Sequence, residues 1–280
     1  MRVASAVVPV LALALLAACK APDSIAKFCS AAVATLKTGD ALFDDMKASC
    51  IRETQTFQPP GTFPVWEADP TACGNVGKQA EGLSAASQLV SKYFTALNDL
   101  ASFRTSTAGD DAKDLLTKAS AQARLAAGPQ KALSSVAGFL TRAATAGYQR
   151  KRLADDIVGV HEDVRIVLDG LGEAVGVVYL QQLQDEERKT ADRYKEFLLQ
   201  HPGNGDAILL LDSRWQADRT GFAAKRKAAM SYVAAIGTLA KGNEDLAAHV
   251  RGLKANELSG LLSPYAAQLE SSVPAIQKAF

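Results

Sequence analysis

The chain has 280 residues, of which 48% are hydrophobic and only 6% are aromatic, and its 31 basic residues nearly balance 30 acidic ones. This length suits one large domain or two small ones, and a composition rich in Ala and Leu but poor in aromatics favours closely packed helices over a β-sandwich. A nearly neutral chain lacks the basic face that nucleic-acid binding requires, so we expect no nucleic-acid partner.

The first nineteen residues have the pattern of a secretory signal. Arg2 precedes an apolar run from Val3 to Leu16, which is shorter than the roughly 20 residues that a membrane-spanning helix needs. The run leads into Leu16-Ala17-Ala18-Cys19. This motif resembles the lipobox of bacterial lipoprotein precursors, and the resemblance covers only this first segment. It implies that residues 1–18 are a cleaved signal peptide and that Cys19 is the lipid attachment site.

The same resemblance implies where the mature chain, residues 19–280, is located. Several acyl chains such as palmitate on Cys19 would form a durable membrane anchor, because each buried CH₂ group contributes about 0.8 kcal/mol. Lys20 follows the cysteine, at the position where an Asp would resemble the usual inner-membrane retention signal. The sequence therefore predicts a lipoprotein of the cell envelope, anchored in the outer membrane on its periplasmic side.

Three further cysteines, Cys29, Cys50 and Cys73, would lie in an oxidising compartment, where one disulfide and one remaining thiol are expected. A bridge between Cys50 and Cys73 would tether the irregular stretch that follows Cys50. The alternative bridge, between Cys29 and Cys50, requires the chain to turn at Gly39-Asp40, so that both cysteines face each other across a helix pair. Either bridge would add about 3 kcal/mol. We favour Cys50–Cys73, because a cysteine in a loop gains most from a covalent tether.

Helical spacing appears soon after the predicted anchor. The first apolar stripe comprises Ile25, Phe28, Cys29, Ala32, Val33 and Leu36. Gly39 is predicted to end this helix, and Asp40 to cap a second one. An irregular loop is expected at about 54–76, where prolines and aromatic residues gather. They are Phe57, Pro59, Pro60, Phe63, Pro64, Trp66 and Pro70.

Beyond this loop the helical pattern returns. A long helical hairpin is predicted at about 171–241, because two long helices joined by a short turn at 201–205 must be antiparallel. Its charged segment, 184–196, is interpreted as a solvated face. Gly242 is predicted to end the second helix of the hairpin, and Asn243 to cap a further helix.

Patterns that resemble cofactor or metal motifs are weak. The stretch from Gly170 to Gly176 misses the nucleotide-binding glycine spacing by one residue and lacks the neighbouring strands, so small residues at a helix contact, or a break in the helix, explain it better. The histidines, His161, His201 and His249, belong to no paired Glu-x-x-His motif. We therefore predict no metal site and no cofactor.

Two basic triplets, Arg150-Lys151-Arg152 and Lys225-Arg226-Lys227, are candidates for contact with lipid phosphates or an acidic partner. Because consecutive helical residues point in different directions, we interpret both triplets as solvated helix faces. Neither a Gly-x-Ser-x-Gly motif nor a Ser next to a His occurs. No catalytic residue is predicted, and an enzyme is the least favoured class of protein.

The sequence thus predicts an all-α, elongated bundle of mainly antiparallel helices that forms a single domain over residues 19–280. The leading functional hypothesis is a non-catalytic envelope lipoprotein, a scaffold or interaction module whose helical surface engages another envelope protein. The alternative hypothesis is a small-molecule-binding bundle. Its pocket would lie between the long helices near Trp215 and Tyr179, or beneath the Phe57–Trp66 loop.

Overall fold

The computed structural model describes residues 20–54, 71–102, 104–122, 127–144, 153–200, 205–252 and 255–280. Over these ranges the chain is helical and contains no strand, which confirms the predicted all-α bundle. The elements in chain order are α1 (Lys20–Thr54), α2 (Gly74–Ala101), α3 (Ala112–Gln122), α4 (Ala127–Ala143), α5 (Leu153–Glu173), the π-helical turn η3 (Ala174–Tyr179), α6 (Leu180–Gln200), α7 (Gly205–His249) and α8 (Ala255–Gln277).

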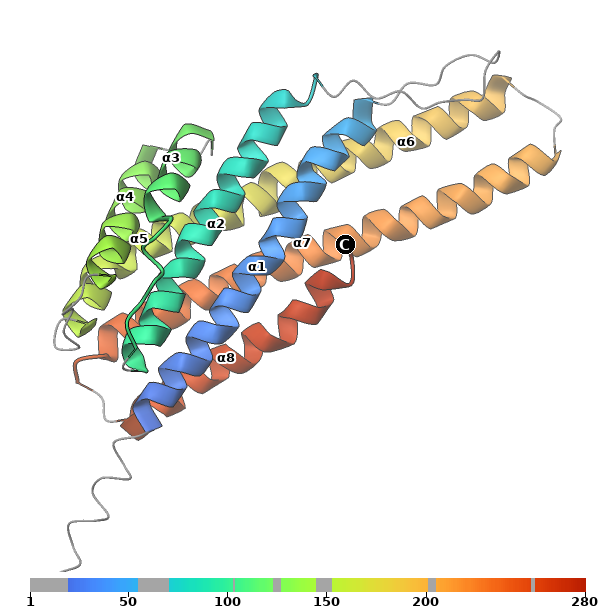
Figure 1. Ribbon diagram of the computed structural model, residues 1–280. Coiled ribbons are helices and arrows are strands. Elements are labelled where there is room, and N and C mark those ends of the chain that lie inside the picture. Colours follow the sequence, from blue (N-terminus) through green and yellow to red (C-terminus); the bar gives the residue numbers. More distant parts are fainter. Residues whose placement is uncertain are drawn as a thin grey trace, which may run out of the picture.

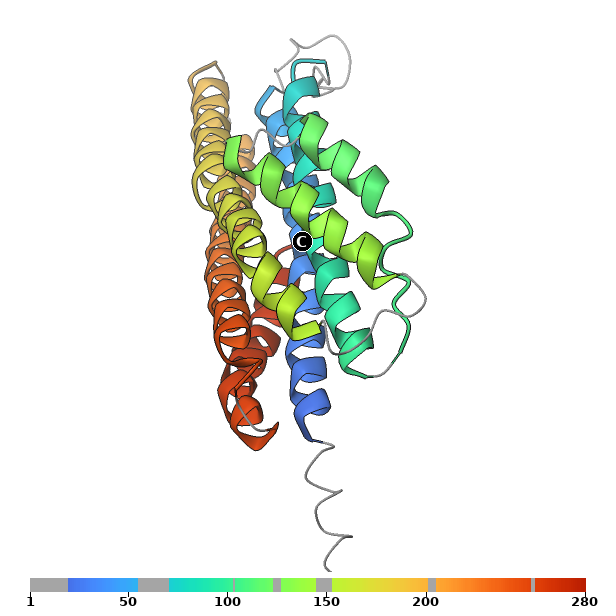
Figure 2. The ribbon, with the colours of Figure 1, turned by 90° about the vertical axis from the view of Figure 1, so that its left-hand side faces the viewer.

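The helices form an elongated bundle (Figures 1 and 2). α1 packs mainly against α2 and α8, while α5 packs against α4 and α7. α5, η3 and α6 follow one another as one continuous helix, and α7 returns beside it in the opposite direction. The α6–α7 end of this hairpin projects beyond the ends of α1 and α2, whereas α1 starts at the opposite end of the molecule (Figure 1).

The continuous helix from Leu153 to Gln200 contains a stretch that is long and apolar enough to cross a membrane by length and composition alone. In the bundle, 44% of that stretch is buried inside the protein. Val164, Val167 and Leu171 of this helix are fully buried and pack in the core. The buried apolar residues of α5 therefore serve its contacts with α4 and α7.

The prediction that Gly39 ends a helix and that Asp40 caps a second one is wrong. α1 is a single helix of 35 residues that runs through both positions. A Cβ atom at Gly39 would lie 2.6 Å from the hydroxyl oxygen of Tyr232 on α7. Glycine is therefore needed here for the close approach of two helices, although it is a poor helix former.

The prediction that Gly242 ends a helix and that Asn243 caps the next one is wrong for the same reason. α7 continues through both residues to His249. A Cβ atom at Gly242 would lie 2.6 Å from a ring carbon of Phe28 on α1, so this glycine also permits close packing. Asn243 is fully buried within the helix, where its side chain accepts a hydrogen bond from the Tyr93 hydroxyl and donates one to the carbonyl of His161.

Cys50 and Cys73 form a disulfide, with their Cα atoms 5.9 Å apart, which confirms the favoured pairing. The bridge joins the last turns of α1 to the residue that precedes α2. The rival bridge is excluded because Cys29 and Cys50 both lie on the unbroken α1, about 30 Å apart along its axis. Cys29 is a buried free thiol in the core.

Several predicted features lie outside the described residues. They are the lipobox with Cys19, the first basic triplet at 150–152, His201 and most of the loop at about 54–76. At the edges of that loop, Thr54 is the last residue of α1, and α2 already begins at Gly74.

Candidate functional site

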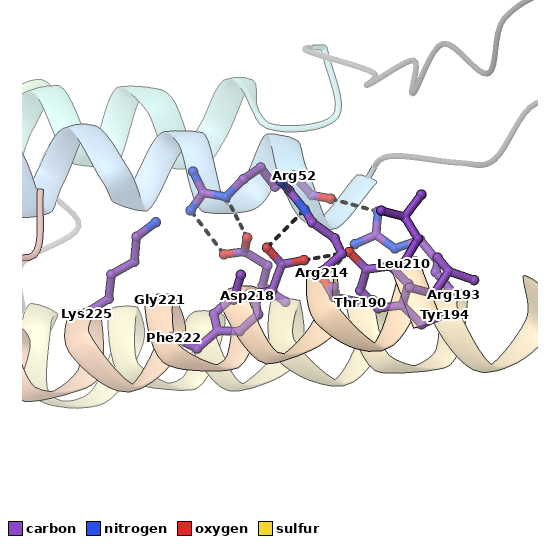
Figure 3. Close-up of a pocket in the computed structure, with 13 residues that line it drawn as sticks. Arg52, Thr190, Arg193, Tyr194, Leu210, Arg214, Asp218, Gly221, Phe222 and Lys225 are labelled. Carbon is purple, nitrogen blue, oxygen red and sulfur yellow. Dashed lines mark hydrogen bonds and ion pairs between the residues drawn. The ribbon is translucent and has the colours of Figure 1, made fainter. Parts of the chain in front are cut away.

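A cleft of about 760 Å³ lies between the C-terminal part of α1 and the two arms of the α6–α7 hairpin (Figure 3). Arg52 comes from α1, and Glu186, Thr190, Arg193 and Tyr194 come from α6. The wall on α7 consists of Leu210, Leu211, Arg214, Ala217, Asp218, Gly221, Phe222 and Lys225. Three segments distant in the sequence therefore build one site.

A buried carboxylate marks the inner end of the cleft. Glu186 is only 3% exposed, although it lies in the charged segment that the sequence predicted to be solvated. One carboxylate oxygen accepts a hydrogen bond of 2.6 Å from the Ser49 hydroxyl, and the other accepts one of 2.5 Å from Nε of Arg52. A carboxylate removed from water needs such charged and polar partners, so Glu186 ties α6 to α1.

Asp45 is the second acidic group of this inner network. Its carboxylate accepts hydrogen bonds from the Tyr179 hydroxyl at 2.6 Å, from Lys225 at 2.7 Å and from Arg52 at 3.0 Å. Burial alone would raise the pKa of Asp45, but the hydrogen bonds from Lys225 and Tyr179 and the charge of Arg52 outweigh it and lower the pKa. The carboxylate is thus held ionised, and it joins α1 to η3 and α7.

The basic partners of this network respond to the same surroundings. Burial alone would lower the pKa of Arg52. The hydrogen bond to Glu186 and the charge of Asp45 outweigh burial and raise the pKa, so the guanidinium stays charged. Burial and the neighbouring Asp45 raise the pKa of Tyr179, which keeps its hydroxyl protonated as a donor. We call Asp45, Ser49, Arg52, Tyr179, Glu186 and Lys225 the inner network.

The outer part of the cleft has a second, smaller set of polar contacts. The Tyr194 hydroxyl donates to Asp218 at 2.6 Å, and Arg214 lies 3.6 Å from the same carboxylate. Burial and the hydrogen bond to Asp218 raise the pKa of Tyr194 to about 12. Arg193 donates to the backbone carbonyl of Arg52 at 3.2 Å and to the hydroxyl of Thr190 at 3.0 Å, and burial lowers its pKa.

The second basic triplet differs from the solvated face that was predicted. Lys225 pairs with Asp45 across to α1, and Arg226 pairs with Glu187 on α6. Lys227 is exposed. The three consecutive side chains do point in different directions, but two of them meet acidic residues of neighbouring helices.

The pocket proposed near Trp215 and Tyr179 can be compared with the cleft directly. Tyr179 belongs to the inner network, and the Trp215 ring packs at 5.9 Å from the ring of Tyr194, which lines the cleft. Neither residue lines the cleft itself; Trp215 borders a separate hollow with Asp185 and Arg188. Sequence reasoning therefore pointed to the neighbourhood of the cleft without finding its charged wall.

The remaining sequence candidates form local contacts. The ring of His161 lies 2.7 Å from the carbonyl of Val158, and the ring of His249 lies 2.9 Å from the carbonyl of Asp245. In the part of the chain that the structure describes, no group of three or more His, Cys, Asp or Glu side chains is placed to hold a metal ion.

The glycines of the stretch from 170 to 176 lie within the helix that passes from α5 into η3. Built Cβ atoms at Gly172 and Gly176 would lie in ordinary or tight contact with Ile236 and Val233 of α7, at 3.7 and 3.4 Å. This stretch is therefore part of a helix contact.

A second surface feature lies at the projecting end of the hairpin. Five aliphatic side chains there are between 37% and 73% exposed, and we call them the apolar tip: Leu198, Leu199, Ile208, Leu209 and Leu210. Aliphatic residues gathered on a protein surface are typical of contact sites.

The fold and the cleft together define an all-α bundle with a charged, partly apolar cleft beneath a projecting helical hairpin. No protein-family model matches the chain, and a search of curated proteins and of solved structures likewise finds no match.

Proposed function

We propose that the protein is a lipid-anchored, non-catalytic interaction module of the cell envelope, attached to the outer membrane through Cys19 and facing the periplasm. Its apolar tip contacts another envelope protein. The single observation that carries this proposal is the tip itself, because it exposes aliphatic side chains at the end of the molecule farthest from the start of α1.

The position of the tether relative to the tip supports this arrangement. α1 begins at Lys20, immediately after the predicted attachment site, so the helical body would start next to the membrane. A helix of 35 residues is about 52 Å long, and the hairpin projects beyond its far end. The tip would then stand at least about 50 Å from the anchor, a separation that supports contact with a partner away from the membrane.

Burying the tip against a partner is favourable because exposed apolar surface contributes about 25 cal/mol per Å² when it leaves water. The aliphatic side chains carry no charge that would favour a nucleic acid or an anionic lipid surface. A protein surface with its own apolar patch is the matching partner.

In-cell photo-crosslinking tests the contact. A photoreactive residue replaces Leu199, Leu209 or Leu210, and matched controls replace the exposed Lys227 and Lys241 on α7. We expect a discrete crosslinked envelope protein from the tip positions alone. Equal crosslinking at the control positions, or none at the tip, would contradict the proposal.

The anchor is tested separately by metabolic labelling with a palmitate analogue and by membrane fractionation. Cys19→Ser should lose the label and leave the membrane fraction, whereas Cys29→Ala should keep both. A labelled Cys19→Ser chain would refute the attachment site.

A further inference from the structure

The two sides of the cleft differ in chemistry. α1 and α6 contribute mostly charged or hydroxyl-bearing groups, including Arg52, Glu186 and Arg193. α7 contributes Arg214, Asp218 and Lys225, but its other lining residues are apolar side chains and a glycine. This apolar surface continues outward to Leu210, which is 72% exposed and belongs to the apolar tip. A groove with one polar and one largely apolar wall suits a ligand that is itself amphiphilic.

The charge of the cleft favours an anion. Its lining includes four cations, Arg52, Arg193, Arg214 and Lys225, but only the carboxylates of Glu186 and Asp218. When Asp45, which pairs with Lys225, and the neighbouring Lys189–Glu53 ion pair are included, the cations exceed the carboxylates by one.

Arg193 is the most suitable cation for an incoming anion. Its nitrogens donate to the carbonyls of Lys189 and Arg52 and to the hydroxyl of Thr190, and these hydrogen bonds fix the guanidinium between the inner network and the Tyr194–Asp218 pair. Burial lowers the pKa of Arg193 even though the charges of Glu186, Asp218 and Glu53 act to raise it, so an additional negative charge near the guanidinium would be favourable.

The apolar wall has room for an aliphatic chain. Phe222 is buried at the inner end, and Leu211 lies toward the outer end. Between them, a Cβ atom built at Gly221 would meet nothing within 4 Å. The volume of about 760 Å³ is within the usual range of ligand sites, about 300–1,000 Å³.

We propose that the cleft binds an amphiphilic anion, a single carboxylate or phosphate group on an aliphatic chain. The anionic group pairs with Arg193, and the chain lies along α7 over Gly221 toward Leu210. Leu210 belongs to both the cleft and the apolar tip, so the ligand and a partner at the tip would share this one side chain, whereas the head group is held inside the cleft.

Calorimetric titration of the purified chain with palmitate, below the concentration at which palmitate forms micelles, tests the proposal. We expect one saturable site, an affinity that rises from octanoate to laurate to palmitate, and at least about tenfold weaker binding of methyl palmitate, which lacks the charge. A parallel titration with hexadecyl phosphate shows which anionic group is preferred. No saturable binding of either anion, or equal binding of the methyl ester, would overturn the proposal.

Two matched glycine variants locate the site. Gly221→Leu should fill the cleft and weaken palmitate binding at least about tenfold, while Gly237→Leu, on the same helix and also facing open space, should leave binding unchanged. Undiminished binding by Gly221→Leu would overturn the proposed site.

A charge pair of variants tests the head group. Arg193→Gln should weaken palmitate binding at least about tenfold and reduce the preference over the methyl ester, whereas Arg188→Gln, at an exposed arginine of α6, should do neither. Thermal unfolding of each variant verifies that the bundle is intact. An unchanged preference in a folded Arg193→Gln chain would refute the role of Arg193.

Discussion

Individual glycines determine how closely the long helices approach. At Gly39 the missing side chain admits the Tyr232 hydroxyl, and at Gly242 it admits the ring of Phe28. Both aromatic side chains are buried. The contact of α1 with α7 therefore depends on two positions at which even a methyl group does not fit.

Gly39→Ala should destabilise the protein by roughly 1–3 kcal/mol, because overpacking forces buried side chains to shift. Gly159→Ala is the matched control: its built Cβ meets nothing within 4 Å, so the better helix propensity of Ala should stabilise the protein by up to about 1 kcal/mol. Urea unfolding followed by circular dichroism measures both. Changes of the same sign would contradict the packing role of Gly39.

Asp45 makes the stability of the bundle dependent on pH. Folding lowers its pKa from the ordinary value of 3.8, so the unfolded chain binds the proton more readily. The resulting stabilisation is fully present above that ordinary value and is lost as pH falls through the lower folded pKa.

We therefore expect the difference in unfolding free energy between the wild type and Asp45→Asn to be largest near neutral pH and to shrink below about pH 4. Urea unfolding across the acid range measures this difference. Glu162→Gln is the control, since Glu162 forms an exposed ion pair with Arg165, which salt screens, and should have little effect. A difference for Asp45→Asn that is constant with pH would argue against a titrating Asp45.

At the scale of elements, the polar contacts of the inner network join α6 to α1, because α6 buries few apolar side chains in the core. α6 has only Leu183 and Glu186 buried, so its hold on the bundle depends on few side chains. Glu186 reaches Ser49 and Arg52, and Gln182 donates to the carbonyl of Met46 at 2.6 Å. Polar contacts thus fix the part of the hairpin that lies beside α1.

Removing only one partner of the Glu186–Arg52 ion pair should lower the stability of the protein. Glu186→Met leaves Arg52 without its closest carboxylate and should lower the unfolding free energy by about 3 kcal/mol. The double variant Glu186→Met/Arg52→Met removes both charges and should recover part of that loss. Chemical unfolding of the wild type, Glu186→Met, Arg52→Met and the double variant completes the cycle, and a double variant less stable than Glu186→Met would contradict the pairing.

Local sequence patterns predicted the helical class and the first apolar stripe, because both depend on residue spacing. They also predicted the disulfide, because only three cysteines were available to pair. They did not predict the continuity of α1 and α7. A glycine followed by Asp or Asn indicates a helix end equally well when its real use is a close contact with a distant helix. Glu186 was missed for a similar reason: its neighbours are charged, and its partners lie 134 to 137 residues away.

On the scale of the whole molecule, burial changes along one helix. The described part of α7 before Phe222 has no buried side chain, whereas many residues after it are buried, among them Tyr232, Ile236 and Leu239. Contacts that resist opening are therefore concentrated at one end of the hairpin.

Hydrogen exchange should follow this division. We expect amides at 205–221 to exchange at least about a hundredfold faster than those at 223–247, although both ranges belong to the same helix. Exchange measured by mass spectrometry, with α1 as the protected reference, resolves the two halves. Uniform protection along α7 would contradict the prediction.

The unbroken course of α7 also has a mechanical consequence. A helix of 45 residues, about 68 Å long, is supported by the core along one half and extends away from it along the other. A sideways force at the free end of such a beam produces its greatest bending moment where the support begins. That point is near Phe222, one turn from the Lys225–Asp45 ion pair. A force on the end of the hairpin would therefore strain the helix most at the inner end of the cleft.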